Sequence, residues 1–269
     1  DSQSFEAHYG LARAQEALAD TEAAMKSVNQ ALALKQDAPD AVALKGALLL
    51  QSDQAAEAAV VLEEARAVAP DNEVVHTYLP AAYIALEDLG KAESAARDAL
   101  KHMPGSPQAH LTLALVLVGR EKPDEAEAVL RQGMEVAPED PLLPLRLAEL
   151  LAMQGKKLEE AVQLADRSVE LERGDGSADL IAAMALRRLG REDGAISRLR
   201  DAATAHPRNP RLWMTLAAVH RAAGDEEEAA RAAAMAFRVA PRRRVRTAPL
   251  DGEGAAGPAE QPTVPGSAG

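Results

Sequence analysis

Histidine is the residue type in this chain with the clearest chemical potential, because an imidazole can bind a metal ion or transfer a proton near neutral pH. His8, His76 and His110 are separated by multiples of 34 residues. If a structural unit of that length repeats, the three side chains take equivalent places in different units. Packed neighbouring helices lie roughly 10 Å apart, so one metal ion could not bridge such places. We therefore expect these histidines to be core residues and predict no metal site and no cofactor.

Sequence motifs for catalysis are absent. The chain has no glycine-rich phosphate loop followed by Lys and Ser/Thr, no Gly-x-Ser-x-Gly elbow and no His-Glu-x-x-His. Gly90-Lys91 lacks both the upstream glycine and the following hydroxyl. Acidic pairs are frequent, but they fall where polar turns and outer helix faces are expected, so solvation explains them. We predict no catalytic residue and a protein that is not an enzyme.

Composition narrows the class of protein. The 269 residues carry a net charge of −12, which argues against non-specific binding of nucleic acid. The chain lacks cysteine, which excludes disulfides and thiolate ligands. The longest apolar run, from Leu111 to Val118, is broken only by Thr112 and is far shorter than the roughly 20 residues of a membrane helix. A soluble protein is expected, with the cytoplasm and the periplasm both left open.

A repeat of 34 residues organises the chain. It is marked by alanines with one 35-residue step among the 34-residue steps, namely Ala24, Ala58, Ala92, Ala126, Ala161, Ala195 and Ala229. A proline follows most of these alanines by twelve residues, namely Pro70, Pro104, Pro138, Pro207 and Pro241. Small or aliphatic residues between them, such as Leu130 and Gly133, keep one helical stripe and would let a neighbouring helix approach closely.

Each unit reads as two helices joined by a polar turn. In residues 107–138 the first helix is expected from about Gln108 to Gly119, and the second begins at Pro123, where the missing N–H costs nothing. The second helix should end before Pro138. One such hairpin cannot bury its apolar face alone, whereas stacked hairpins can.

This pattern resembles the tetratricopeptide repeat family, with the best match in the last unit, which has Trp213, Gly224, Ala229 and Pro241. The resemblance implies an all-α, right-handed superhelix of bacterial type. The predicted repeats span 5–38, 39–72, 73–106, 107–140, 141–175, 176–209 and 210–241. Residues 242–269 form an Arg-then-Pro/Gly/Ala-rich segment that we expect to be disordered. Pro80 falls inside a first helix and is expected to kink or shorten it.

In this family the first helices of the repeats line a concave groove. That resemblance places aliphatic side chains of the middle repeats on the groove wall: Leu50, Ile84, Leu111, Leu115, Val118, Leu142, Leu145 and Met153. Helix 108–118 is apolar nearly all round, which normally means that every face is covered, and stacking covers only two faces.

The last two repeats add positive charge to the same inner side. There the predicted groove continues with Met184, Arg187, Arg188, Arg211, Met214 and Arg221. An apolar middle and a basic C-terminal end suit a helix or extended peptide with apolar anchors and acidic residues at one end. The alternative is a helical phase shifted by one residue, which would make these side chains ordinary core.

Three functions follow from these features. The first is a non-catalytic scaffold that binds a protein partner in the groove, by analogy with bacterial relatives in secretion, polysaccharide export or envelope assembly. The second is the regulatory or substrate-presenting arm of a larger enzyme such as a glycosyltransferase or a sulfotransferase. The third is self-association, because no capping helix follows the stripe Ala229, Ala233, Ala236 and Phe237.

Overall fold

The computed structural model describes residues 4–240, which form fourteen α-helices and no strand. The helices are α1 (Phe5–Ala17), α2 (Thr21–Leu34), α3 (Pro39–Gln51), α4 (Ala55–Val68), α5 (Glu73–Ala85), α6 (Leu89–His102), α7 (Pro107–Gly119), α8 (Pro123–Val136), α9 (Leu142–Gln154), α10 (Leu158–Leu171), α11 (Ser177–Arg188), α12 (Glu192–Ala205), α13 (Pro210–Ala222) and α14 (Glu226–Val239). The predicted tail, 242–269, lies outside the described residues.

The helices begin where the sequence offers capping groups. The Asn72 side chain accepts hydrogen bonds from the backbone N–H groups of Val74 and Val75 at the start of α5. The Ser106 hydroxyl caps α7, and Pro107 takes the first helical position. Pro80 lies inside α5, but that helix keeps 13 residues, so the expected shortening does not occur.

The turn inside each helix pair has a left-handed residue at one repeated position. Its members are Ala19, Asp53, Glu87, Glu121, Gly155, Gly190 and Gly224. Four of the seven are not glycine and therefore carry backbone strain. The pair α9–α10 has a second left-handed residue, Lys157, which accommodates the one extra residue of that unit.

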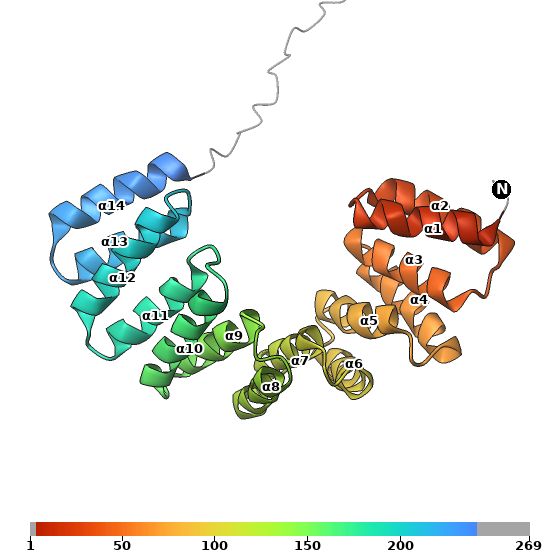
Figure 1. Ribbon diagram of the computed structural model, residues 1–269, viewed down its shortest axis with the longest axis horizontal. Coiled ribbons are helices and arrows are strands. Elements are labelled where there is room, and N and C mark those ends of the chain that lie inside the picture. Colours follow the sequence, from red (N-terminus) through yellow and green to blue (C-terminus); the bar gives the residue numbers. More distant parts are fainter. Residues whose placement is uncertain (1–3, 241–269) are drawn as a thin grey trace, which may run out of the picture.

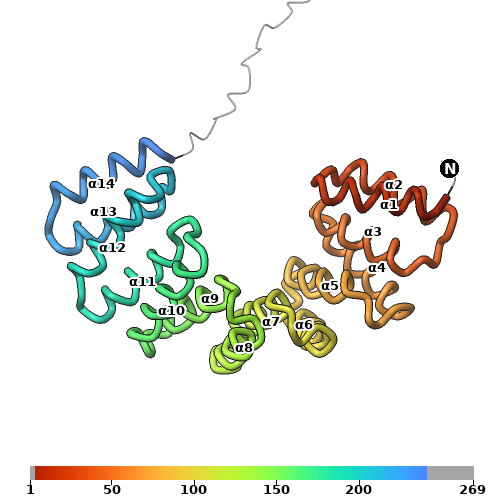
Figure 2. The backbone as a smooth tube through the Cα atoms, viewed as in Figure 1, coloured from red at the N-terminus to blue at the C-terminus, as the bar shows by residue number. Residues whose placement is uncertain are grey.

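Stacking of the helix pairs bends the chain into an open arch. Each odd-numbered helix contacts the even-numbered helix that follows it, and each even-numbered helix contacts the next odd-numbered one. From α1 to α11, consecutive odd-numbered helices also contact one another. Figures 1 and 2 show the result: α5, α7 and α9 lie on the concave side of the arch, and α6, α8 and α10 lie on its convex side.

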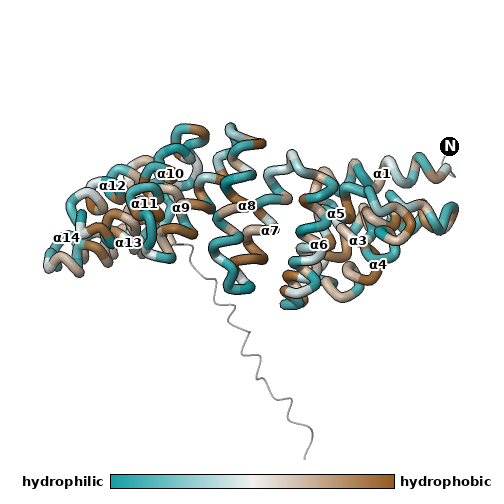
Figure 3. The backbone as a smooth tube through the Cα atoms, turned by 90° about the horizontal axis from the view of Figure 1, so that it is seen from below, coloured by the Kyte–Doolittle hydropathy of each residue, from teal (hydrophilic) through white to brown (hydrophobic). Residues whose placement is uncertain are grey.

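The core runs between the helices along the whole arch. Seen from below, the helices form one row in which hydrophobic and hydrophilic segments alternate (Figure 3). Small residues allow close approach: a Cβ added at Gly133 would lie 2.7 Å from Cδ2 of Leu143 in the next pair. His76 and His110 are buried, which confirms their expected place in the core, and His8 is half-buried. The all-α solenoid predicted from the sequence is confirmed.

Candidate functional site

Several large apolar side chains on the odd-numbered helices are exposed to solvent. Leu115 on α7 is 61% exposed, Met153 on α9 is 59% exposed and Met214 on α13 is 63% exposed. Val118 and Leu142 are exposed as well. Leaving such side chains in water forfeits roughly 1.5–3 kcal/mol each relative to full burial. These five side chains are therefore accessible to solvent.

The other predicted apolar groove residues contribute less surface. Leu50, Ile84, Leu111 and Met184 are half-buried against the core clusters. Leu145 is buried and belongs to the core itself. The same helices thus supply both buried core residues and exposed apolar residues.

A cavity of about 1400 Å³ opens between α9, α11, α12 and α13. It brings together six of the predicted groove residues: Leu142, Leu145, Met153, Met184, Arg187 and Arg211. The remaining predicted residues lie outside this cavity. Residues that the sequence reasoning did not single out also line it, among them Arg173, Asp175 and Arg198. They come from inter-helix turns and from α12, so a search restricted to first helices could not find them.

The four arginines that were predicted to form the basic end of the groove make different contacts. Nη1 of Arg188 donates hydrogen bonds to the backbone carbonyls of Ala152 and Met153 at the end of α9, where it balances the negative end of the helix. Arg187 Nε lies 3.6 Å from a carboxylate oxygen of Glu192. All four arginines are exposed, but the contacts just described hold Arg187 and Arg188 against the protein. Arg211 and Arg221 are therefore the arginines of this end that are most available to a ligand.

Acidic side chains in the cavity partly neutralise its arginines. Arg198 pairs with Asp166 and, at 2.8 Å from Nε to Oδ1, with Asp179. Arg146 Nη1 lies 2.8 Å from Oε2 of Glu149. A hydrogen bond from Ser177, aided by the charge of Arg211, lowers the pKa of Asp175. The site is therefore a mixed surface rather than a uniformly basic one.

A separate cluster of titratable side chains lies on α5 and α6. His76, Asp98 and His102 have ligand-type atoms within 4.8 Å of one another. The two imidazole rings stack, however, with centroids 4.3 Å apart and planes 18° apart. Nitrogen lone pairs lie in the ring plane, so nearly parallel stacked rings do not aim at one ion. His76 Nε2 instead faces the backbone carbonyl of Pro70 and His102 Nδ1 faces that of Asp98, while His102 Nε2 lies 3.2 Å from Oδ1 of Asp71.

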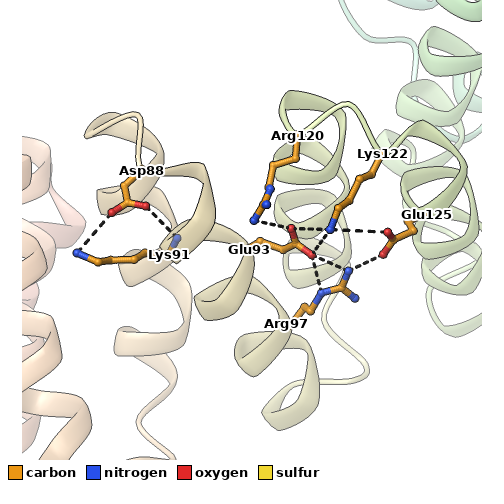
Figure 4. A network of polar contacts seen from close by, with 7 residues as sticks. All are labelled: Asp88, Lys91, Glu93, Arg97, Arg120, Lys122 and Glu125. Carbon is orange, nitrogen blue, oxygen red and sulfur yellow. Dashed lines mark hydrogen bonds and ion pairs between the residues drawn. The ribbon is translucent and has the colours of Figure 1, made fainter.

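A network of charged side chains joins the α5–α6 pair to the α7–α8 pair. Figure 4 shows Glu93 of α6 surrounded by Arg97, Arg120 and Lys122. The Glu93 side chain is nearly buried, and hydrogen bonds from Arg97 and Lys122 lower its pKa. Every cation in the network already has a carboxylate partner. This network therefore stabilises the stack and does not supply a free catalytic group.

Comparison with known proteins agrees with this architecture. Models of the tetratricopeptide repeat match residues 5–37, 83–143 and 177–219. The chain belongs to the tetratricopeptide repeat family and has several repeats. No curated protein matches it significantly in sequence. No helix within residues 4–240 is both long enough and apolar enough to cross a membrane.

Solved structures share the fold at low sequence identity. A tetratricopeptide repeat protein from Parabacteroides merdae is 18% identical over 90% of this chain and 96% of its own, with a TM-score of 0.68. PilF of Pseudomonas aeruginosa is 18% identical over 76% of this chain and 92% of its own, with a TM-score of 0.65. YrrB, described as a repeat protein with an unusual peptide-binding site, is 18% identical over 68% of this chain and 93% of its own, with a TM-score of 0.51.

Proposed function

We propose that this protein is a non-catalytic scaffold that binds a peptide or helix of a partner protein in its concave groove. The observation that carries the proposal is the row of exposed apolar side chains on the inner helices, Leu115 and Val118 on α7, Leu142 and Met153 on α9, and Met214 on α13. Single exposed apolar residues are ordinary on protein surfaces, but a concave series of them is typical of a binding surface.

The proposed partner's chemistry follows from the side chains of the predicted groove. Its apolar anchors would lie on α7 and α9, and acidic residues at one end would lie near Arg211 and Arg221 on α13. Because these two guanidinium groups are exposed, they would add mainly association rate and salt dependence, while apolar burial supplies affinity. YrrB, a protein of the same fold whose structure is described as having a peptide-binding site, supports a peptide as ligand.

The proposal is tested with designed peptides rather than with an unknown partner. An amphipathic peptide with leucines at helical spacing and glutamates at one end is labelled and titrated with the protein by fluorescence anisotropy. Leu115→Glu and Met153→Glu are each expected to weaken binding at least tenfold. Arg211→Glu with Arg221→Glu is expected to weaken it and to remove most of its salt dependence.

Two controls make the result interpretable. Val60→Glu introduces the same charge at an exposed apolar residue of the second helix α4, and it should leave binding unchanged. A peptide with lysines in place of the glutamates should bind more weakly. Equal binding by Leu115→Glu and the native protein would rule out the groove, and unchanged salt dependence in the double arginine variant would rule out its basic end.

The proposed groove does not by itself define the cellular role of the protein. A place in a bacterial secretion, polysaccharide-export or envelope-assembly complex is a proposal that rests on resemblance to the family alone. The same groove would serve equally well in a regulatory or substrate-presenting arm of a glycosyltransferase or sulfotransferase. A catalytic domain encoded in the same gene would favour the second role.

A further inference from the structure

Two repeat positions on the odd-numbered helices change charge in the same direction along the stack. The first position is occupied, from α1 to α13, by Glu6, Asp40, Val74, Gln108, Leu142, Ser177 and Arg211. The second position is occupied by Glu16, Leu50, Ile84, Val118, Ala152, Arg187 and Arg221. Each series begins with an acidic residue, continues through uncharged residues and ends with arginine.

The two repeat positions belong to one face of the stack. Leu142, Ser177 and Arg211 of the first series line the same cavity as Arg187 of the second. Stacked repeats present equivalent residues in the same direction relative to their neighbours, so the other members of each series continue this face. No member of the first series is buried, and Ala152 is the one buried member of the second. The exposure of these positions therefore holds at internal repeats as well as at the ends.

The charge of the whole repeats changes in the same direction. Residues 4–72 contain five basic and eleven acidic side chains, a net charge of −6, whereas residues 176–240 contain ten basic and eight acidic ones, a net charge of +2. Figure 1 shows α3 and α11 on opposite arms of the arch, with α7 between them. A ligand that lies along the odd-numbered helices therefore meets a negative end, an apolar centre and a positive end.

Local contacts only partly neutralise the negative end. The Glu6 carboxylate accepts a hydrogen bond from the Ser4 hydroxyl, and the Asp40 carboxylate accepts one from the Asn72 side-chain amide. Neither donor carries a charge. Arg13 is the only arginine or lysine of α1 and offsets one of the two acidic charges of that helix. The negative end therefore keeps an excess of carboxylates.

The positive end keeps free charge as well. Within residues 4–240, neither Arg211 nor Arg221 forms a salt bridge with a carboxylate, although the charge of Arg211 acts on Asp175 nearby. Arg187 is the member of the two series that has an acidic partner, Glu192, at 3.6 Å. Two exposed guanidinium groups on α13 are therefore available to an acidic ligand.

We propose that the groove binds a segment with basic residues at one end and acidic residues at the other, and that charge fixes its direction. The basic end would lie beside Glu6, Glu16 and Asp40, and the acidic end beside Arg211 and Arg221. This inference rests on the groove of the proposed function and adds to it a second charged end and one orientation. Exposed ion pairs contribute little free energy each, so the ends select direction and register while apolar burial supplies most of the affinity.

The length of the stack sets the length of the segment. Four steps between neighbouring odd-numbered helices separate α3 from α11, and at roughly 10 Å for each step they span about 40 Å. A helix rises 1.5 Å per residue, so about 27 helical residues cover this span. A shorter helix would reach only one of the two charged ends.

Three labelled peptides of that length test the charge pattern. They share one apolar helical face and carry lysines at one end and glutamates at the other, glutamates at both ends, or glutamines at both ends. In fluorescence anisotropy at low salt, the peptide with opposite ends should bind about tenfold more tightly than the peptide with glutamine ends. Glu16→Lys with Asp40→Asn should remove this advantage. Glu64→Lys with Glu135→Gln changes the net charge equally on the exposed surface of α4 and α8, and should preserve it.

A spin label tests the orientation. The chain has no cysteine, so one introduced cysteine can carry a nitroxide at a chosen end. Gly10→Cys places it on α1, where a Cβ meets no atom within 4 Å, and Ala222→Cys places it at an exposed position of α13. A fluorophore at the lysine end of the peptide should be quenched by the first label and not by the second. Equal quenching by both labels, or stronger quenching from α13, would overturn the proposed orientation.

The binding results separate this inference from the groove itself. Equal affinity of the peptides with opposite ends and with glutamine ends would overturn the inference, while weaker binding of both to Leu115→Glu would still support the groove. Loss of the advantage in the control variant Glu64→Lys with Glu135→Gln would mean that overall charge acts, not the two series. Failure of all three peptides to bind would contradict both the inference and the proposed function.

Discussion

Tyr83 of α5 donates a hydrogen bond from its phenolic oxygen to Oε1 of Glu63 on α4, with 2.7 Å between the two oxygens. The tyrosine is nearly buried, and this bond joins consecutive helix pairs. Burial, followed by the hydrogen bond to the Glu63 carboxylate, raises the pKa of Tyr83 to about 12. The phenol must keep its proton for this contact to persist.

The first prediction concerns alkaline pH. Because the folded state holds the Tyr83 proton more tightly than the unfolded chain does, the stability from this group is present below pH 10 and is lost as pH rises towards about 12. Absorbance titration should show one tyrosine ionising near that pH. Tyr83→Phe should cost about 1 kcal/mol at neutral pH, measured by urea unfolding, and should reduce the alkaline loss. An identical alkaline profile in the variant would contradict this assignment.

The second prediction concerns acid pH and the network of Figure 4. Nζ of Lys122 lies 3.0 Å from Oε1 of Glu93, and Arg97 and Arg120 approach the same carboxylate. The lowered pKa of Glu93 means that its stabilisation is present above pH 4.5 and is lost as pH falls further. Glu93→Gln should destabilise the protein by about 1–3 kcal/mol at pH 7.

The exposure of the cations sets the size of that effect. Arg97, Arg120 and Lys122 are each partly in solvent, so screening keeps the loss below that of a fully buried pair. Urea unfolding should show the difference between native protein and variant shrinking below pH 4.5. Asp124→Asn, at an exposed acidic residue of α8, serves as the control and should change little.

The third prediction uses the left-handed turn residues. Glu121 has a φ of 59°, and Gly190 takes the equivalent place with a φ of 72°. Glu121→Gly should stabilise the protein by up to about 1 kcal/mol, because the strain of a side chain in this conformation is removed. Gly190→Ala should destabilise it by a similar amount, although a Cβ there meets no atom within 4 Å. Thermal unfolding measures both, and changes of the same sign would contradict the explanation from φ.

The fourth prediction separates structural from ligand-facing arginines. Arg188 bonds the last carbonyls of α9, so Arg188→Met should destabilise the fold by about 1–2 kcal/mol. Arg221 is exposed on α13, and Arg221→Met should leave stability within about 0.5 kcal/mol. Urea midpoints compare the two variants. If Arg188→Met unfolds at the same urea midpoint as the native protein, Arg188 has no structural role and is free to bind a ligand.

The sequence by itself determined the class of fold. The 34-residue spacing of Ala92 and Ala126, with a small residue such as Gly133 on the same stripe, is consistent with few arrangements other than stacked helix pairs. It also predicted the buried positions of His76 and His110, although His8, at the same repeat position, is only half-buried. These are local and periodic properties, and a periodic pattern can be recognised from the sequence alone.

Tertiary structure alone decided how each inner side chain is used. Leu111 and Leu145 take the same repeat position, yet Leu111 is half-buried and Leu145 is buried in the core. Arg188 and Arg221 look alike in sequence, yet one caps a helix of the preceding pair. Such differences depend on the angle between neighbouring pairs and on turns distant in sequence. A residue's helical phase fixes its direction from the axis, but burial depends on what lies along that direction.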